Sequence, residues 1–256
     1  LAASVGRYGQ WLADAGLSDP QLQARLGRVL DRLRDDRMSV AFVAEFSRGK
    51  SELINALFFA DFGQRVLPSS AGRTTMCPTE LLWDPSLPPG IRLLPIETRL
   101  RDVTVADLRH VPDEWRTVPI DPKNVESLKL AFECVRETKR VPVEDAILMG
   151  LFDETDEDSP LAPDDDDMIE VSCWRHALVN IPHPLLETGL VVIDTPGLNA
   201  IGAEPELTLN LIPSAHAVLF VLAADAGVTR TDIEVWRERI SPAHRSGRFV
   251  VLNKID

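Results

Sequence analysis

The chain has 256 residues, of which 45% are hydrophobic, enough for a substantial core in one large or two small domains. Its formal net charge is −13 and it has no basic stripe, so we do not expect a nucleic-acid partner. The longest apolar runs, 190–193 and 217–224, are far shorter than the roughly 20 residues of a membrane-spanning helix. The three cysteines lack metal-ligand spacing. Together these features favour a cytoplasmic protein.

Residues 1–37 are predicted to form helices outside the main domain. One helix is expected over 7–15. Asp19 and Pro20 then offer a helix cap and a first-turn proline, and leucine or valine recurs at helical spacing at positions 22, 26, 29, 30 and 33. We therefore expect a bundle-type segment that precedes a second domain at 38–256.

The pattern from residue 38 onward predicts an α/β domain. Strands are expected at 39–46, 79–83, 91–96, 169–173, 177–181, 190–193, 217–222 and 249–252, and helices at 50–59, 124–138, 204–212 and 232–240. This alternation predicts a mostly parallel central sheet flanked by helices, with a ligand at the carboxyl ends of the strands. A long insertion, about 97–168, separates the first strands from the later ones.

An acidic run lies at the end of this insertion, where residues 153–167 include nine acidic side chains and no basic one. The run could be a loop that binds a divalent metal. However, Pro160 and Pro163 interrupt it and the EF-hand pattern is absent, so we interpret it as a solvated loop.

The segment AEFSRGKS, residues 44–51, has the residue types of a phosphate-binding loop between a strand and a helix. Backbone amides of such a loop can surround a β-phosphate, helped by the positive end of the following helix. Gly49 allows close backbone approach, Lys50 can reach the β- and γ-phosphates, and the Ser51 hydroxyl can bind Mg²⁺. The nucleotide-binding residues expected here are Glu45, Phe46, Ser47, Arg48, Gly49, Lys50 and Ser51.

Two further motifs are expected around the γ-phosphate. In GRTTMCP, one threonine hydroxyl can bind Mg²⁺ while an amide contacts the γ-phosphate, and both Thr74 and Thr75 qualify by their chemistry. In DTPG, Asp194 ends an apolar strand, where it can hold Mg²⁺ through water, and the Gly197 amide can contact the γ-phosphate. Leu198 follows, where many small GTPases have glutamine. Because leucine cannot orient a water molecule, another group must complete catalysis.

The final motif, NKID, indicates which base is bound. Asp256 can accept hydrogen bonds from N1–H and the exocyclic amine of guanine, and adenine offers no such pair of donors. Lys254 can lie along the face of the base, and Asn253 can tie this segment to the phosphate loop. The motifs together predict a protein that binds GTP.

Arg48 of the phosphate loop could act as an arginine finger in cis, but an arginine that faces solvent or a partner is the commoner case.

The runs VAEFSRGKSELINALF, LPSSAGRTTMCPTEL, DTPGLN and VVLNKID resemble the dynamin superfamily, and bacterial dynamin-like proteins in particular. The resemblance covers about 39–256. It implies that Ser47 helps to bind a K⁺ or Na⁺ ion that replaces an arginine finger, and that Thr75 positions Mg²⁺ and the attacking water. Phe46 and Ser70 stand where glutamine and glycine are often found. The expected catalytic residues are Ser47, Lys50, Thr75 and Gly197.

The resemblance also implies partners. GTPase domains of this superfamily self-associate across the nucleotide face, which stimulates hydrolysis, and a stalk with a lipid-binding tip normally follows. We therefore expect this chain to be the N-terminal portion, ending at the guanine motif, of a longer protein that remodels membranes. Such a protein would be cytoplasmic and peripheral at the inner face of the cell membrane.

Two other functions fit the motifs. One is a translation-type GTPase that acts on the ribosome or tRNA, against which the long insertion and the lack of a basic patch argue. The other is a scaffold that uses GTP for assembly without hydrolysing it, which Leu198 permits.

Overall fold

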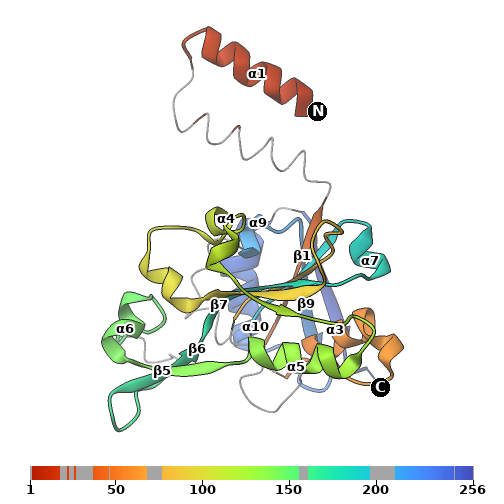
Figure 1. Ribbon diagram of the computed structural model, residues 1–256, viewed down its shortest axis with the longest axis vertical. Helices are drawn as coiled ribbons and strands as arrows, with labels where there is room; N and C mark the ends of the chain where they lie inside the picture. Colours follow the sequence, from red (N-terminus) through yellow and green to blue (C-terminus); the bar gives the residue numbers. More distant parts are fainter. Residues whose placement is uncertain are drawn as a thin grey trace. The chain divides into compact units, whose positions relative to one another are not determined.

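The computed structural model describes residues 2–17, 22, 26, 37–45, 47–67, 77–155, 161–196, 211–244 and 246–255. The chain divides into two compact units, Leu1–Met38 and Ser39–Asp256. In the first unit, helix α1 (Ala2–Asp14) includes most of the helix predicted at 7–15 and begins earlier (Figure 1). The second predicted helix of this unit lies outside the described residues, apart from positions 22 and 26. No helix among the described residues is long and apolar enough to cross a membrane.

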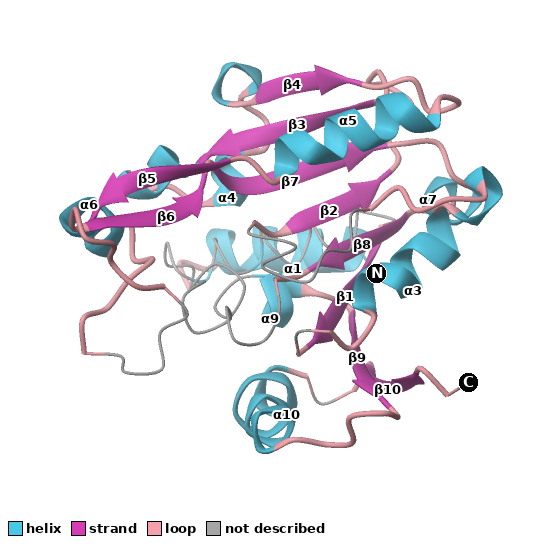
Figure 2. Cartoon of the chain, turned by 90° about the horizontal axis from the view of Figure 1, so that it is seen from below, coloured by secondary structure: helices cyan, strands magenta, loops and turns pink. Residues whose placement is uncertain are grey.

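An eight-stranded sheet forms the centre of the second unit, and helices lie on both of its faces (Figure 2). The strand order is β10-β9-β1-β8-β2-β7-β3-β4. These strands are β1 (Met38–Ala44), β2 (Thr79–Leu82), β3 (Gly90–Pro95), β4 (Arg116–Pro119), β7 (Trp174–Asn180), β8 (Leu190–Asp194), β9 (Ala217–Ala223) and β10 (Arg248–Asn253). The predicted α/β class with a central sheet and flanking helices is confirmed.

The direction of the strands differs between the two parts of the sheet. Pairs β1–β9, β9–β10 and β2–β7 are parallel, as predicted, whereas β2–β8, β3–β7 and β3–β4 are antiparallel. Short connections account for two of these reversals. Parallel strands need a crossover of about a dozen or more residues, and the segments 83–89, from β2 to β3, and 181–189, from β7 to β8, are too short for one. The sheet is therefore mixed.

The helices and single turns of this unit lie mainly between strands. They are α3 (Lys50–Phe58), α4 (Val105–Leu108), α5 (Val125–Val135), α6 (Val143–Leu148), α7 (Pro184–Glu187), α9 (Ile212–Ser214), α10 (Arg230–Val235) and α11 (Ser241–Ala243), with a π-helical turn at Trp236–Ile240. Short 3₁₀ turns occupy Ala60–Phe62, Ile96–Leu100 and Pro112–Glu114.

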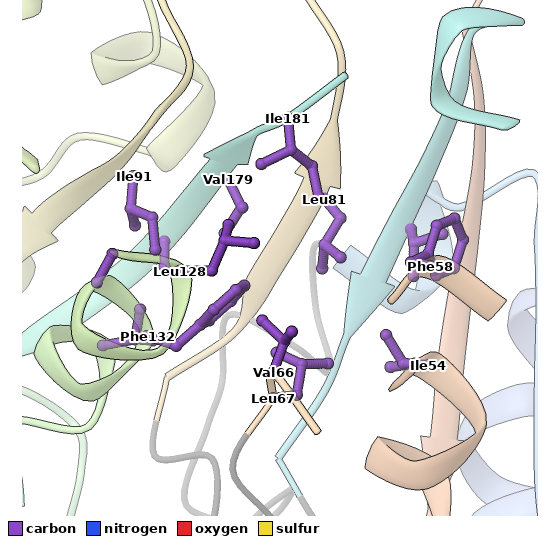
Figure 3. Packing of buried hydrophobic residues seen from close by; sticks show 14 of the residues in the cluster. Ile54, Phe58, Val66, Leu67, Leu81, Ile91, Leu128, Phe132, Val179 and Ile181 are labelled. Carbon is purple, nitrogen blue, oxygen red and sulfur yellow. The ribbon is translucent and has the colours of Figure 1, made fainter. Parts of the chain in front are cut away.

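Alternation of side chains along the strands gives the sheet two apolar faces. On one face, Ile54 and Phe58 of α3 and Leu128 and Phe132 of α5 belong to one cluster with Leu81, Ile91 and Val179 of the strands (Figure 3). The opposite face carries two clusters, one with α9 and the π-helical turn and one with α4 and Trp115. Helix α5 begins where predicted because Asn124 accepts hydrogen bonds from the backbone amides of Glu126 and Ser127.

The insertion at about 97–168 contains more structure than the sequence indicated. Its strand β5 (Thr138–Pro142) pairs with β6 (Met168–Ser172) in a separate two-stranded antiparallel sheet, which packs with α6 around its own small core. Its strand β4 joins the edge of the main sheet. Both β4 and β5 were missed because Arg116–Pro119 and Thr138–Pro142 are short, largely polar and lack an apolar alternation.

Candidate nucleotide-binding site

The candidate phosphate loop joins β1 to α3, as its sequence predicts. The last five residues of β1 are buried, so the strand holds the start of the loop firmly in the core. Gly49 caps α3 with a left-handed backbone, φ 83°, and a Cβ atom there would lie only 2.3 Å from Asn253 Nδ2. Ser47 also has a positive φ, 63°. The loop therefore turns tightly, and only glycine can be accommodated at position 49.

Lys50 extends from the start of α3 to the end of β8. Its Nζ donates to Asp194 Oδ1 at 2.5 Å and also to the backbone oxygen of Thr195. The Thr195 hydroxyl donates in turn to the backbone oxygen of Phe42 in β1, 2.7 Å away. The structure thus brings together the lysine of the phosphate loop and the aspartate of DTPG, both of them buried.

Asn253, the last residue of β10, contacts the same loop. Its Nδ2 donates to the backbone oxygens of Arg48 at 3.1 Å and Gly49 at 3.3 Å. Next to it, Lys254 has a positive φ of 52°, and its Nζ donates to Asp225 Oδ2 at 3.1 Å. The motif at the end of the chain therefore lies against the phosphate loop, which is more than 200 positions away in sequence.

Arg48 does not face solvent. Its side chain is only 4% exposed, and Nη2 donates to Glu45 Oε2 and, at 3.1 Å, to Asp232 Oδ2 at the start of α10. Of the two orientations expected for Arg48, towards solvent or towards a partner, the first is therefore wrong. Sequence reasoning also missed its partner Asp232, although the T-x-x-D pattern of Thr229 and Asp232 was visible and forms a capping box for α10.

With this geometry established, the comparison with known families is decisive, because the family model described as the Dynamin family matches residues 40–255. The chain belongs to the dynamin family. Over 54 residues it is 41% identical to a bacterial dynamin-like protein of Nostoc punctiforme, an alignment that covers 21% of this chain and 8% of that protein. Over 60 residues it is 47% identical to the isoniazid-induced protein IniA of Mycobacterium tuberculosis, covering 23% and 9%.

A solved structure has a similar fold. It is described as an oligomerised bacterial dynamin pair that senses and tethers membranes over a long range, and it matches with a TM-score of 0.50 at 19% identity. The match covers 93% of this chain but 29% of that one. This chain therefore spans a small part of the length of its dynamin-family relatives.

Several predicted site residues of this dynamin-family domain lie outside the described residues. These are Phe46, Ser70, Thr74, Thr75, Gly197, Leu198 and Asp256. The predicted residues that the structure does bring together are Glu45, Ser47, Arg48, Gly49, Lys50 and Ser51 of the loop, Asp194 of β8, and Asn253 and Lys254 at the end of β10.

Ser51 and Asp194 are the described residues expected to hold Mg²⁺. Ser51 lies in the first turn of α3, and Asp194 is a buried carboxylate at the end of β8. Both offer oxygen atoms, the donors that Mg²⁺ prefers, and Asp194 adjoins the lysine expected to contact phosphate. The donor chemistry therefore fits Mg²⁺ bound together with a nucleotide. No group of three or more His, Cys, Asp or Glu side chains in the described part of the chain forms a metal site by itself.

A buried charged cluster lies beside this site in the sheet. Glu80 of β2, which is in register with Ile193 of β8, accepts a hydrogen bond from Arg109 Nη2 at 2.5 Å and contacts His176 Nε2 at 2.9 Å. Burial alone would raise the pKa of Glu80, but the Arg109 charge and the contacts with His176 outweigh it and lower the pKa to about 2. Glu80 therefore stays ionised within the core.

Proposed function

We propose that this dynamin-family domain binds GTP and hydrolyses it to GDP and phosphate. The observation that carries the proposal is the pair of hydrogen bonds from Asn253 to the backbone of Arg48 and Gly49. These bonds join the segment expected to select guanine to the loop expected to hold the phosphates. The meeting of Lys50 with Asp194 at the end of β8 supports the same proposal.

Each motif has a distinct part in the proposed reaction. Lys50 and the amides of the loop bind the β- and γ-phosphates, while Asp256 accepts hydrogen bonds from guanine and Lys254 lies along the base. Thr75 and Gly197 orient the attacking water and the γ-phosphate. Ser51, Thr75 and, through water, Asp194 would hold Mg²⁺, which would supply positive charge beside the phosphate oxygens.

The proposed site also includes a K⁺ or Na⁺ ion near Ser47, because Leu198 cannot orient water and Arg48 is engaged by carboxylates.

For the whole protein we propose GTP-dependent self-association through this domain and remodelling of a lipid membrane at the inner face of the cell membrane. Family membership supports this proposal over action on the ribosome or tRNA.

Substitution of Lys50 by alanine tests the proposed function. Lys50→Ala removes the charge expected to contact phosphate, so GTP affinity should fall by at least about tenfold and phosphate release should be lost. The measurements are binding of a fluorescent GTP analogue and phosphate release by the full-length protein, with circular dichroism to verify the fold. Lys129→Ala, a change in the half-exposed lysine of α5 that pairs with Glu126, is the matched control.

Three outcomes are informative. Wild-type protein that binds no GTP contradicts the proposal outright. Wild-type protein that binds GTP without releasing phosphate, alone or with lipid vesicles, supports the non-hydrolysing scaffold instead. Unchanged turnover in Lys50→Ala shows that the phosphate loop has been misinterpreted.

A further inference from the structure

A buried network of charged side chains connects the phosphate loop to α10. Arg48 Nη2 donates both to Glu45 Oε2, three residues earlier in the loop, and to Asp232 Oδ2 of α10. The side chains of Arg48 and Asp232 are 4% and 0% exposed, and that of Glu45 is 18% exposed. Water therefore screens these charges very little, and each depends on the others for compensation.

The same network includes the cap of α10. Asp232 Oδ2 accepts a hydrogen bond from the Thr229 amide at 2.9 Å, and the Thr229 hydroxyl lies 3.4 Å from Glu45 Oε2. Two side chains of the loop thus contact the first turn of α10. Any change in the position of this turn changes the environment of Glu45, which is why the loop and α10 are coupled.

The buried polar atoms of the network are not all satisfied by hydrogen bonds. Within the described residues, Arg48 Nε and Asp232 Oδ1 are buried and have no hydrogen-bond partner. Glu45 is the most exposed of the three charged side chains, and it belongs to the loop that must receive the negatively charged phosphates of GTP. Without Arg48, its carboxylate would repel those phosphates, and Asp232 would be left as an uncompensated buried charge.

We propose that Arg48 is a positioning residue that neutralises Glu45 and Asp232 and so makes the phosphate loop able to accept GTP. This inference rests on the proposed function, and it concerns a role distinct from that of an arginine finger. The guanidinium acts on the two carboxylates and on α10, and it does not contact the reacting phosphate. Its positive charge is needed only because two negative charges lie beside it.

The proposal is tested by removing the charge with and without its partners. Arg48→Met keeps an apolar stem of similar length, and it should weaken GTP binding by at least about tenfold because it exposes the phosphates to Glu45. In the triple variant Arg48→Met, Glu45→Gln, Asp232→Asn the carboxylates are neutral as well, while the amide oxygen at 232 can still cap α10. This variant should recover both GTP affinity and kcat to within about threefold of the wild type.

Arg230→Met is the matched control, because Arg230 lies on the same helix with a side chain that is 91% exposed. Binding of a fluorescent GTP analogue, kcat and KM for phosphate release, and thermal unfolding are measured on the full-length protein. Where Arg48→Met does not fold, the triple variant is compared directly with the wild type. Arg48→Lys, which keeps the charge, should fall between the wild type and Arg48→Met.

Two results would overturn the proposal. One is GTP affinity in a folded Arg48→Met protein equal to that of the wild type. The other is a triple variant that recovers affinity while kcat stays low, which would show that Arg48 acts on the reacting phosphate after all. Failure of the wild type to bind GTP is a separate result that contradicts the proposed function. In that case, thermal unfolding of the Arg48 and Asp232 single and double variants still measures the coupling between loop and helix.

Discussion

Asp256 is the residue on which the choice of guanine depends in the proposed function. Asp256→Asn replaces an acceptor by a donor, so GTP affinity should fall by on the order of 2–4 kcal/mol. Xanthosine triphosphate, which presents an acceptor where guanine has its amine, should in turn be bound better. Competition between the two nucleotides, measured by displacement of a fluorescent analogue, checks this prediction.

Asp113→Asn provides the control for this experiment, because Asp113 is an exposed aspartate in the turn before β4. Full-length protein is required, since Asp256 ends this chain and lies outside the described residues. A folded Asp256→Asn protein with unchanged preference for GTP would contradict the assignment of the base-binding motif.

Residues whose role depends on a local motif could be predicted from the sequence, and residues whose role depends on a distant contact could not. The contact of Asn253 with the phosphate loop was expected, because a strand followed by NKID places asparagine near that loop. The burial of Arg48 was missed. Nothing in the local pattern indicates that Asp232, 184 positions later, comes close enough to form an ion pair with it.

At the scale of elements, β2 and β7 are joined by the buried pair of Glu80 and His176, with Arg109 beyond the end of α4 as the third member. Glu80→Gln should destabilise the protein by about 2–3 kcal/mol, because it leaves the Arg109 charge without its partner. This is below the usual cost of breaking a fully buried pair, since the Arg109 side chain is 30% exposed. Urea unfolding at pH 7 checks the prediction.

The pKa of Glu80 adds a pH dependence to the same pair. The pKa falls from 4.5, its ordinary value, to about 2 in the folded protein. The ionised carboxylate therefore stabilises the folded state fully at pH values above about 4.5. This stabilisation should be lost as the pH falls from about 4.5 towards 2. The difference in unfolding free energy between wild type and Glu80→Gln should shrink over that interval. A difference that stays constant would show that Glu80 is not held ionised.

The elements that sequence analysis predicted best are those buried on both faces or bounded by clear caps. Strand β1, helix α3 and strands β8 and β9 lie within one or two residues of their predicted positions. Strand β6 was predicted, but its partner β5 was missed because Lys139 and Arg140 interrupt it, and its stability comes from pairing and from the small core beneath α6. Tertiary contacts of this kind leave no periodic pattern in the sequence.

At the scale of the whole molecule, the missing glutamine at position 198 leads to a prediction about assembly. An isolated monomer should hydrolyse GTP slowly, because Leu198 cannot orient water and Arg48 is bound to Glu45 and Asp232. If two copies complete the site across their nucleotide faces, turnover per molecule should rise with protein concentration. It should also rise with K⁺ or Na⁺, which would supply positive charge near the leaving group.

Ser47→Ala separates this mechanism from simple nucleotide binding. Because the Ser47 hydroxyl is expected to help hold the monovalent cation, its loss should lower kcat by about tenfold or more while GTP affinity changes by less than about threefold. Phosphate release by full-length protein is measured across a series of protein and K⁺ concentrations, with Ser86→Ala, in the exposed turn after β2, as the control. Fast turnover that depends on neither concentration would contradict both the self-association and the cation. A group within one chain would then have to stabilise the transition state. Turnover of the triple variant at Arg48, Glu45 and Asp232 would show whether that group is the arginine.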